Sequence, residues 1–144
     1  MLAGDKMRLA KLVLTGVFAG AVLSTSMKLI RKITGNPSDI LLYNVDYIPL
    51  IKKYKDIPGI GVAFHYGTCI SSAVGLYYML KPFHLERNVS PYVVVYSFGG
   101  GVLYLLSTLT DELPKYNDLA AWYYWTSSHA MFGIAVGYAL KKIK

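Results

Sequence analysis

Three ionisable side chains stand out in this sequence because they lie in or beside long apolar runs. His65 is in the run 60–80, His129 is near the middle of the run 119–140, and Lys28 is near the end of the run 9–30. Imidazole can relay a proton, ligate a metal or share a hydrogen bond. An ionisable group inside a membrane span is by default a candidate functional group. We therefore take His65, His129 and Lys28 as candidates for a polar site within the membrane.

Each of these residues also has a structural explanation. A neutral histidine can simply hydrogen-bond to a nearby Ser, Thr or Tyr, and His129 directly follows Thr126, Ser127 and Ser128. Lys28 suits an interfacial anchor whose ammonium group reaches the lipid headgroups. If it pointed inward instead, it would bind an anion or a lipid headgroup.

Signals for a cofactor or for an enzyme are weak. Two facing histidines in a helical bundle can bind haem, so haem is an alternative, and no other cofactor or metal is expected. Zinc needs three or four ligands, whereas the apolar runs offer one thiol, Cys69, which suits a small packing residue. GxSxG, HExxH, CxxC and phosphate-loop motifs are absent. The sequence leans away from an enzyme without deciding the question, because lipid enzymes often place polar groups at the interface.

The composition favours a membrane over nucleic acid. Hydrophobic residues make up 54% of the 144 residues, aromatic residues make up 14%, and the formal net charge is +7. Tyr and Trp are enriched at membrane interfaces. The basic residues flank apolar runs, which suits lipid headgroups, whereas nucleic-acid binding needs a folded basic face. The expected partner is therefore the lipid bilayer.

Four apolar runs are long enough to cross a bilayer, for which about 20 helical residues are needed. The last three contain no Asp, Glu, Lys or Arg, and helix-start signals precede or open each of them (Pro58-Gly59, Pro91 and Asn117-Asp118). Four such runs leave too little polar surface for a soluble protein, and they do not alternate as barrel strands do. We predict an all-α integral membrane four-helix bundle, one transmembrane domain over 1–144, with spans at about 9–30, 60–80, 91–110 and 119–140.

The basic residues predict the orientation. With four spans, the N-terminus, the loop 81–90 and the C-terminus share one side, which holds eight basic residues against seven on the other. The short loop 111–118 is mainly acidic, and the C-terminal Lys-Lys-Ile-Lys is purely basic. By the positive-inside rule, we expect both termini in the cytoplasm, with the protein in a bacterial plasma (inner) membrane.

The connection 31–59 is too long for a plain turn. Its apolar residues are interrupted by Asn44, Asp46 and Pro49. We predict an amphipathic segment that lies on the membrane surface, with a re-entrant segment or a surface loop as alternatives. The sequence Asn36-Pro37-Ser38-Asp39 is typical of a helix cap.

Small residues at four-residue spacing predict how the helices meet, because close helix contacts in membranes rely on such residues. The glycine triplet in the third run could instead be a kink or an unwound stretch. The predicted packing residues are Gly16, Gly20, Gly67, Ser71, Gly75, Gly99, Gly100, Gly101, Gly133 and Gly137.

The layout resembles the YagU-like family of small bacterial inner-membrane proteins. The matching features are Ser24 and Lys28 followed by Pro37-Ser38-Asp39, His65 followed by Ala73-Val74-Gly75, and Pro114, Tyr116 and Asn117 before a last span with His129. The chain departs from the family pattern where Trp125 replaces an acidic residue, and the family also has a longer outer loop. The resemblance implies four membrane helices and no particular biochemical activity.

Three functions are consistent with these patterns. The first is a membrane protein with a polar intramembrane site that handles protons, ions or a small solute. The second is a non-catalytic subunit or assembly factor that uses its glycine faces to bind another membrane protein or its own copies. The third is a haem-binding membrane redox protein.

Overall fold

The computed structural model describes residues 3–143, with side chains from Arg8 onward, and this part of the chain is helical without strands. The all-α prediction is confirmed. The α-helices are α1 (Ala3–Thr34), α2 (Ile40–Tyr43), α3 (Ile60–Leu80), α4 (Val89–Leu103) and α5 (Leu119–Lys141). Four 3₁₀ turns lie between them: η1 (Pro37–Asp39), η2 (Lys52–Tyr54), η3 (Lys81–Phe83) and η4 (Tyr104–Leu109).

The helix ends follow local signals in the sequence. α1 runs beyond the predicted 9–30 at both ends and stops where Gly35 adopts φ +74°, a backbone conformation that terminates helices. α5 begins after Asp118, whose carboxylate accepts a hydrogen bond from the Ala121 amide at 2.9 Å. The backbone remains helical through the glycine triplet and tightens into η4 from Tyr104. The triplet is therefore neither an unwound stretch nor the end of the helix.

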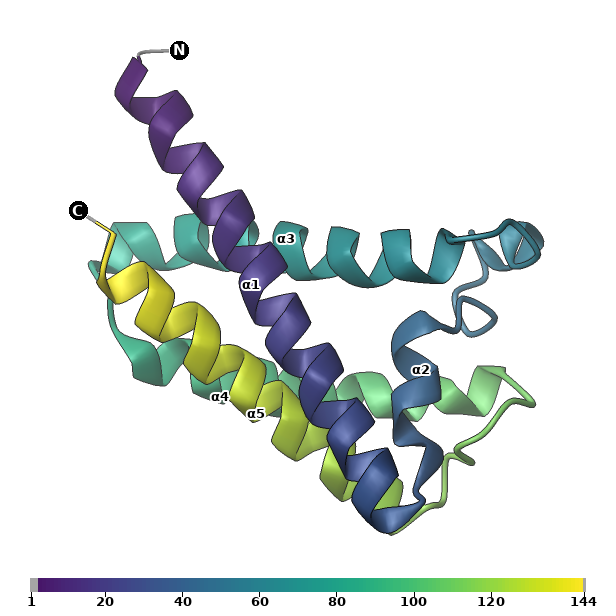
Figure 1. The fold of residues 1–144 in the computed structure, drawn as a ribbon. Coiled ribbons are helices and arrows are strands. Elements are labelled where there is room, and N and C mark those ends of the chain that lie inside the picture. Colours follow the sequence, from purple (N-terminus) through teal and green to yellow (C-terminus); the bar gives the residue numbers. More distant parts are fainter. Residues whose placement is uncertain (1–2, 144) are drawn as a thin grey trace.

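The four long helices form an open arrangement rather than a closed bundle (Figure 1). α1 packs against α3 on one side and against α5 on the other, and α4 packs mainly on α5. α3 and α4 do not pack closely against each other. α1 begins and α5 ends on the same side of the molecule as the connection between α3 and α4, whereas the other connections lie on the opposite side (Figure 1).

Several of the predicted glycines do allow helices to approach closely. A Cβ added at Gly16 would lie 2.5 Å from the Ile70 Cα, and one added at Gly137 would lie 2.9 Å from the Val89 Cα. Contacts of this kind leave no space for a side chain, so the helices meet backbone to backbone. The predicted residues with close neighbours in other helices are Gly16, Gly20, Gly100, Gly101, Gly133 and Gly137.

Four of the predicted packing residues do not take part in the contacts between helices of this chain. Gly67, Ser71 and Gly75 are exposed on α3, and nothing lies within 4 Å of a Cβ added at either glycine. Gly99 also has open space where its side chain would be. The buried face of α3 carries His65 and Cys69 instead. Residues two positions apart point to nearly opposite sides of a helix, so the small-residue stripe faces outward.

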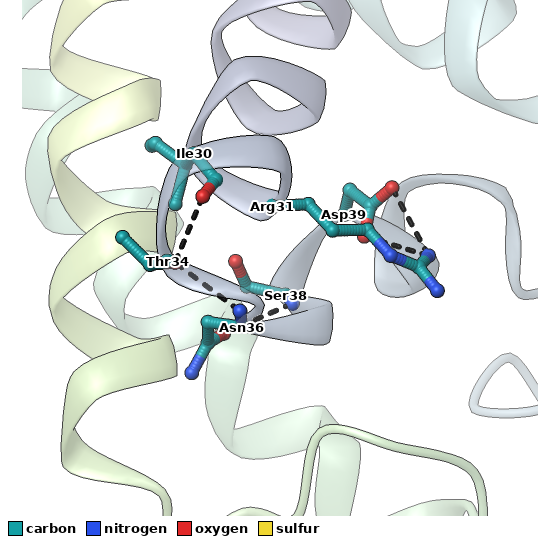
Figure 2. Close-up of polar contacts among 6 residues, drawn as sticks. All are labelled: Ile30, Arg31, Thr34, Asn36, Ser38 and Asp39. Atoms are coloured by element: carbon teal, nitrogen blue, oxygen red, sulfur yellow. Dashed lines mark hydrogen bonds and ion pairs between the residues drawn. The ribbon is translucent and has the colours of Figure 1, made fainter.

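The segment after α1 folds back against the helices. Asn36 accepts a hydrogen bond from the Ser38 amide at 3.1 Å, and Arg31 pairs with Asp39 at 3.2 Å (Figure 2). The Thr34 hydroxyl bridges the same turn, since it donates to Ile30 and accepts from the Asn36 amide (Figure 2). The predicted cap is confirmed.

The apolar residues of this segment contact the protein, so the prediction of a surface-lying amphipathic segment is wrong for residues 37–45. Leu41, Leu42 and Val45 are buried. α2 can approach α3 because Gly61 has no side chain, and a Cβ there would overlap the Tyr43 carbonyl oxygen. Only the following stretch, which contains η2 and the largely exposed Leu50, lies on the surface.

Two helical segments, Arg8–Thr34 and Val89–Leu109, are long and apolar enough to cross a membrane. The second comprises α4 and η4 together, which shows that the 3₁₀ turn extends the apolar segment. Length and composition are thus consistent with a membrane location for this helical protein.

Candidate functional site

A cavity of about 470 Å³ lies between α3 and α4, where these helices do not pack against each other. α5 contributes Trp125, His129 and Phe132 to its wall, and α1 contributes Leu23. Cavities that bind small molecules have volumes of about 300–1,000 Å³ and mostly apolar walls. The polar residues that line this cavity are His65, Thr68, Cys69, Ser72, Tyr47, Tyr96 and His129.

Leu42 of α2 and Tyr47 and Ile48 of the segment that follows it also line the cavity. Burial raises the pKa of Tyr47 to about 12, so its phenol is neutral at physiological pH. Tyr43, in α2, hydrogen-bonds through its hydroxyl to Ser24 on α1. The segment is therefore attached to the helices and adds no charge to the cavity.

His65 uses both of its ring nitrogens within the protein. Its Nε2 lies 3.1 Å from the Gly20 carbonyl oxygen, which can only accept, so Nε2 carries the hydrogen. The Cys69 sulfur lies 3.9 Å from Nδ1, at the limit of a weak thiol hydrogen bond. The buried ring also contacts Tyr43 and Tyr66 edge to face. His65 therefore joins α1 to α3 as a neutral, structural histidine.

His129 keeps one nitrogen free. Its Nδ1 donates to the Trp125 carbonyl oxygen at 2.8 Å, so the neutral ring has its lone pair on Nε2. No hydrogen-bond partner for Nε2 occurs in the described part of the chain. The partly buried ring packs on the Trp125 ring with the centroids 4.5 Å apart. His129 thus offers a hydrogen-bond acceptor to the cavity.

Two glycines of α4 leave space for the side chains of α5 and accept hydrogen bonds from them. A Cβ at Gly100 would lie 2.6 Å from the Cβ of His129, so no larger residue fits there without displacing α5. The Gly100 carbonyl oxygen accepts from the Trp125 indole at 2.9 Å, and that of Gly101 accepts from Trp122 at 3.1 Å. The triplet therefore positions His129 and Trp125 at the cavity.

Tyr96 is a cavity residue that the sequence did not single out. It is 9% exposed, and its hydroxyl is buried without a hydrogen-bond partner among the described residues. Its ring packs against Phe132 with the centroids 4.7 Å apart. Ser72 faces the same cavity from α3: its hydroxyl donates to the Cys69 carbonyl oxygen at 3.1 Å and lies beside the Tyr96 hydroxyl, but beyond the length of an ordinary hydrogen bond. With 13 tyrosines in the chain, residue type alone could not identify this one.

The three candidates from the sequence are only partly brought together. His65 and His129 line the same cavity. Lys28 does not line it: its side chain is exposed, and its ammonium nitrogen lies 5.9 Å from the centre of the Tyr43 ring. Lys28 thus makes a cation–π contact with Tyr43 near the C-terminal end of α1.

The two histidines do not fit a pair of axial haem ligands. Each ligand would have to present a nitrogen lone pair to the iron. The Nε2 of His65 donates to Gly20 and its Nδ1 faces Cys69, so only the Nε2 of His129 is available. Within residues 8–143, no three His, Cys, Asp or Glu side chains cluster as metal ligands would.

No protein-family model, curated protein or solved structure matches this chain. What the cavity can bind is therefore inferred from the residues that line it. Its wall is mainly apolar, and two of its polar groups have no hydrogen-bond partner among the described residues: the Nε2 acceptor of His129 and the hydroxyl of Tyr96.

Proposed function

We propose that this chain is a bacterial inner-membrane protein with four spans, formed by α1, α3, α4 with η4, and α5. α3 and α5 comprise 21 and 23 residues, close to the length of a bilayer crossing, and Lys141 at the end of α5 is their only charged residue. Their outward sides expose large apolar residues, which suit contact with lipid. Examples are Val62 and Met79 on α3 and Met131, Ile134 and Tyr138 on α5. The YagU-like resemblance supports the same layout.

We further propose that the protein binds a small solute in the cavity between α3 and α4. The observation that carries this proposal is the pair of unused hydrogen-bonding groups, on His129 and Tyr96, at an otherwise apolar cavity. A few convergent polar groups on an apolar wall are typical of ligand sites. Proton or ion transfer has less support, because His65 is engaged on both nitrogens and no charged residue lines the cavity.

The four-span layout predicts opposite sides for two exposed basic residues, Lys53 and Arg87. In a background where Cys69, the single cysteine, is replaced by Ser, we would introduce Lys53→Cys or Arg87→Cys. With cytoplasmic termini, a membrane-impermeant maleimide should label Cys at 53 in intact bacterial cells and reach Cys at 87 only after lysis. If only α1 and α4 crossed, both positions would be labelled in intact cells.

A second candidate function is assembly with another membrane protein or with a second copy. The specific observation is the exposed stripe of Gly67, Ser71 and Gly75 on α3, whose two glycines have no close neighbour among the described residues. Small residues at this spacing let another helix approach closely in a membrane.

Two matched glycine substitutions discriminate between these functions. Gly99 lines the cavity and Gly75 lies on the outer stripe, and both have open space at the Cβ position. Leu also favours helix more than Gly does, so neither change should prevent folding. Gly99→Leu should fill the cavity and reduce any co-purifying small molecule at least about tenfold. Gly75→Leu should leave that molecule in place and reduce the particle size only if the stripe mediates assembly.

The measurement is mass spectrometry of solvent extracts, together with native mass spectrometry of the protein in mild detergent. If a small molecule co-purifies equally with wild type and with Gly99→Leu, the cavity is not its site. If the wild-type protein is always a single copy without partners, the assembly function is excluded.

A further inference from the structure

The charge of the cavity limits the kind of solute that it can hold. None of its lining residues is Asp, Glu, Lys or Arg, and the lining residue Tyr47 is neutral. Burial of an ionised group without a partner is strongly unfavourable. A carboxylate, phosphate or ammonium headgroup would find no opposite charge here. The bound molecule should therefore be uncharged.

The hydrogen-bonding groups add a second restriction. The Nε2 of His129 can only accept, because the ring proton is on Nδ1 and donates to Trp125. The buried, unpartnered hydroxyl of Tyr96 can donate. A ligand hydroxyl satisfies both groups, since it accepts from Tyr96 and donates to His129. A ketone or ester oxygen satisfies Tyr96 alone.

The two groups share the wall of one cavity and come from α4 and α5, which pack against each other. Gly100, against which His129 packs, lies four residues after Tyr96 on α4, which is about one helical turn. Phe132 contacts Tyr96 and lies three residues after His129 on α5. The remainder of the wall is apolar and suits a hydrocarbon body.

The cavity is open to the outer surface of α4. Val95 and Leu103 both line it, yet they are 43% and 51% exposed. In a four-span protein this side faces lipid, so a lipid-soluble molecule can reach the cavity from within the bilayer.

On the basis of the proposed function, we propose that the cavity binds an uncharged lipid alcohol, with an apolar chain or ring system and a hydroxyl group held between Tyr96 and His129. Trp125 lines the same cavity and provides a probe. The chain has two tryptophans, so Trp122→Phe leaves Trp125 as the only one. Bromine atoms quench tryptophan fluorescence on contact, which makes brominated lipids suitable ligands.

The experiment titrates this variant in detergent with brominated oleyl alcohol, the corresponding carboxylic acid, its methyl ester and a brominated phosphatidylcholine. We expect the alcohol to bind about tenfold more tightly than the ester, as expected for one additional hydrogen bond to His129. The acid in its ionised form and the phospholipid should bind more weakly than the alcohol.

Two substitutions identify the groups involved. His129→Asn retains an amide that can donate to the Trp125 carbonyl, but its acceptor, Oδ1, lies on a shorter side chain and not at the position of Nε2. The substitution should therefore weaken binding of the alcohol about tenfold and leave binding of the ester unchanged. Tyr96→Phe removes the hydroxyl that donates, so it should weaken binding of both the alcohol and the ester. If His129 had a purely structural role, its substitution would change the affinity for all probes equally.

The outcomes separate this inference from the proposed function. If alcohol and ester bind equally to the variant with Trp125 alone, or if His129→Asn weakens every probe alike, the assignment of a lipid alcohol is wrong. The site itself would still stand if Gly99→Leu abolished quenching. If all four probes quench equally and Gly99→Leu has no effect, ordinary lipid chains contact Trp125, and both proposals fail. The comparison of alcohol with ester needs neither His129→Asn nor Tyr96→Phe, so a variant that fails to fold does not prevent the test.

Discussion

Gly133→Ala should lower the free energy of unfolding by about 3 kcal/mol, the upper range for overpacking in a close-packed contact. A Cβ at this position would lie 2.7 Å from the Tyr92 carbonyl oxygen and 2.8 Å from the Val93 Cα. Both are backbone atoms, so no side-chain rotation relieves the overlap. α5 would have to move away from α4, and the contacts of Phe132 with Tyr96 would loosen as well.

The interface between α4 and α5 is sensitive because each helix provides a glycine where the other approaches. Gly133 on α5 receives the backbone of α4 at Tyr92, and Gly100 on α4 receives His129 of α5. The indole of Trp125 then donates to the Gly100 carbonyl oxygen. Separation of the helices at one glycine therefore also disturbs the cavity wall.

The matched control is Gly67→Ala on the outer side of α3, where nothing lies within 4 Å of the new Cβ. This change should leave stability unchanged or raise it by up to about 1 kcal/mol, because Ala favours helix more than Gly does. Denaturant unfolding in detergent micelles, followed by circular dichroism, measures both variants. Equal stability of Gly133→Ala and Gly67→Ala would show that α4 and α5 are not packed as closely as described.

Replacement of His65 by Ala should destabilise the protein by about 2–4 kcal/mol, whereas His129→Asn should cost much less. His65→Ala removes a buried ring together with its hydrogen bond to the Gly20 carbonyl oxygen and its contact with the Cys69 thiol. Loss of a buried side chain costs a few kcal/mol, and loss of a buried hydrogen bond costs about 1 kcal/mol. The change also removes the hydrogen bond that links α1 to α3.

His65→Gln is the matched control, because its amide can donate to the Gly20 carbonyl oxygen and should restore part of the loss. Cys69 gives a second readout, since it is 5% exposed and is the only cysteine. Its reaction with N-ethylmaleimide should be faster in His65→Ala than in the wild type or in His65→Gln. If His65→Ala costs less than about 1 kcal/mol and Cys69 stays protected, His65 does not have the structural role that we assign to it.

Helix positions could be predicted from the sequence because their determinants are local. The run 60–80 coincides with α3, and the carboxylate of Asp118 caps α5 as its position suggested. The Asn36-Pro37-Ser38-Asp39 cap forms within a few residues of chain. Hydrophobic length, glycine ends and capping side chains act within one or two turns, and so the sequence shows them directly.

The side on which each helix residue lies could not be predicted in the same way. α3 is apolar around most of its circumference, so the small residues of the Gly67 stripe suggested that face as the packing face, whereas the face with Cys69 is the buried one. The outcome depends on rotation about the helix axis, which α1 determines through Gly16 and Gly20. Leu41 and Leu42 posed the same problem, because only their contacts within the protein distinguish them from lipid-facing residues.

The residues of the candidate site show this division most clearly. The two histidines could be identified from the sequence because they are ionisable residues inside long apolar runs. Their different roles depend on non-local contacts: the Gly20 carbonyl oxygen occupies His65, whereas the cavity leaves one nitrogen of His129 free. Tyr96 was one tyrosine among 13 until the separation of α3 and α4 left its hydroxyl buried without a partner. Residue types and local spacing thus determined the helices and the histidine candidates, and helix packing decided which groups face the cavity, because hydrogen-bond partners come from distant parts of the chain.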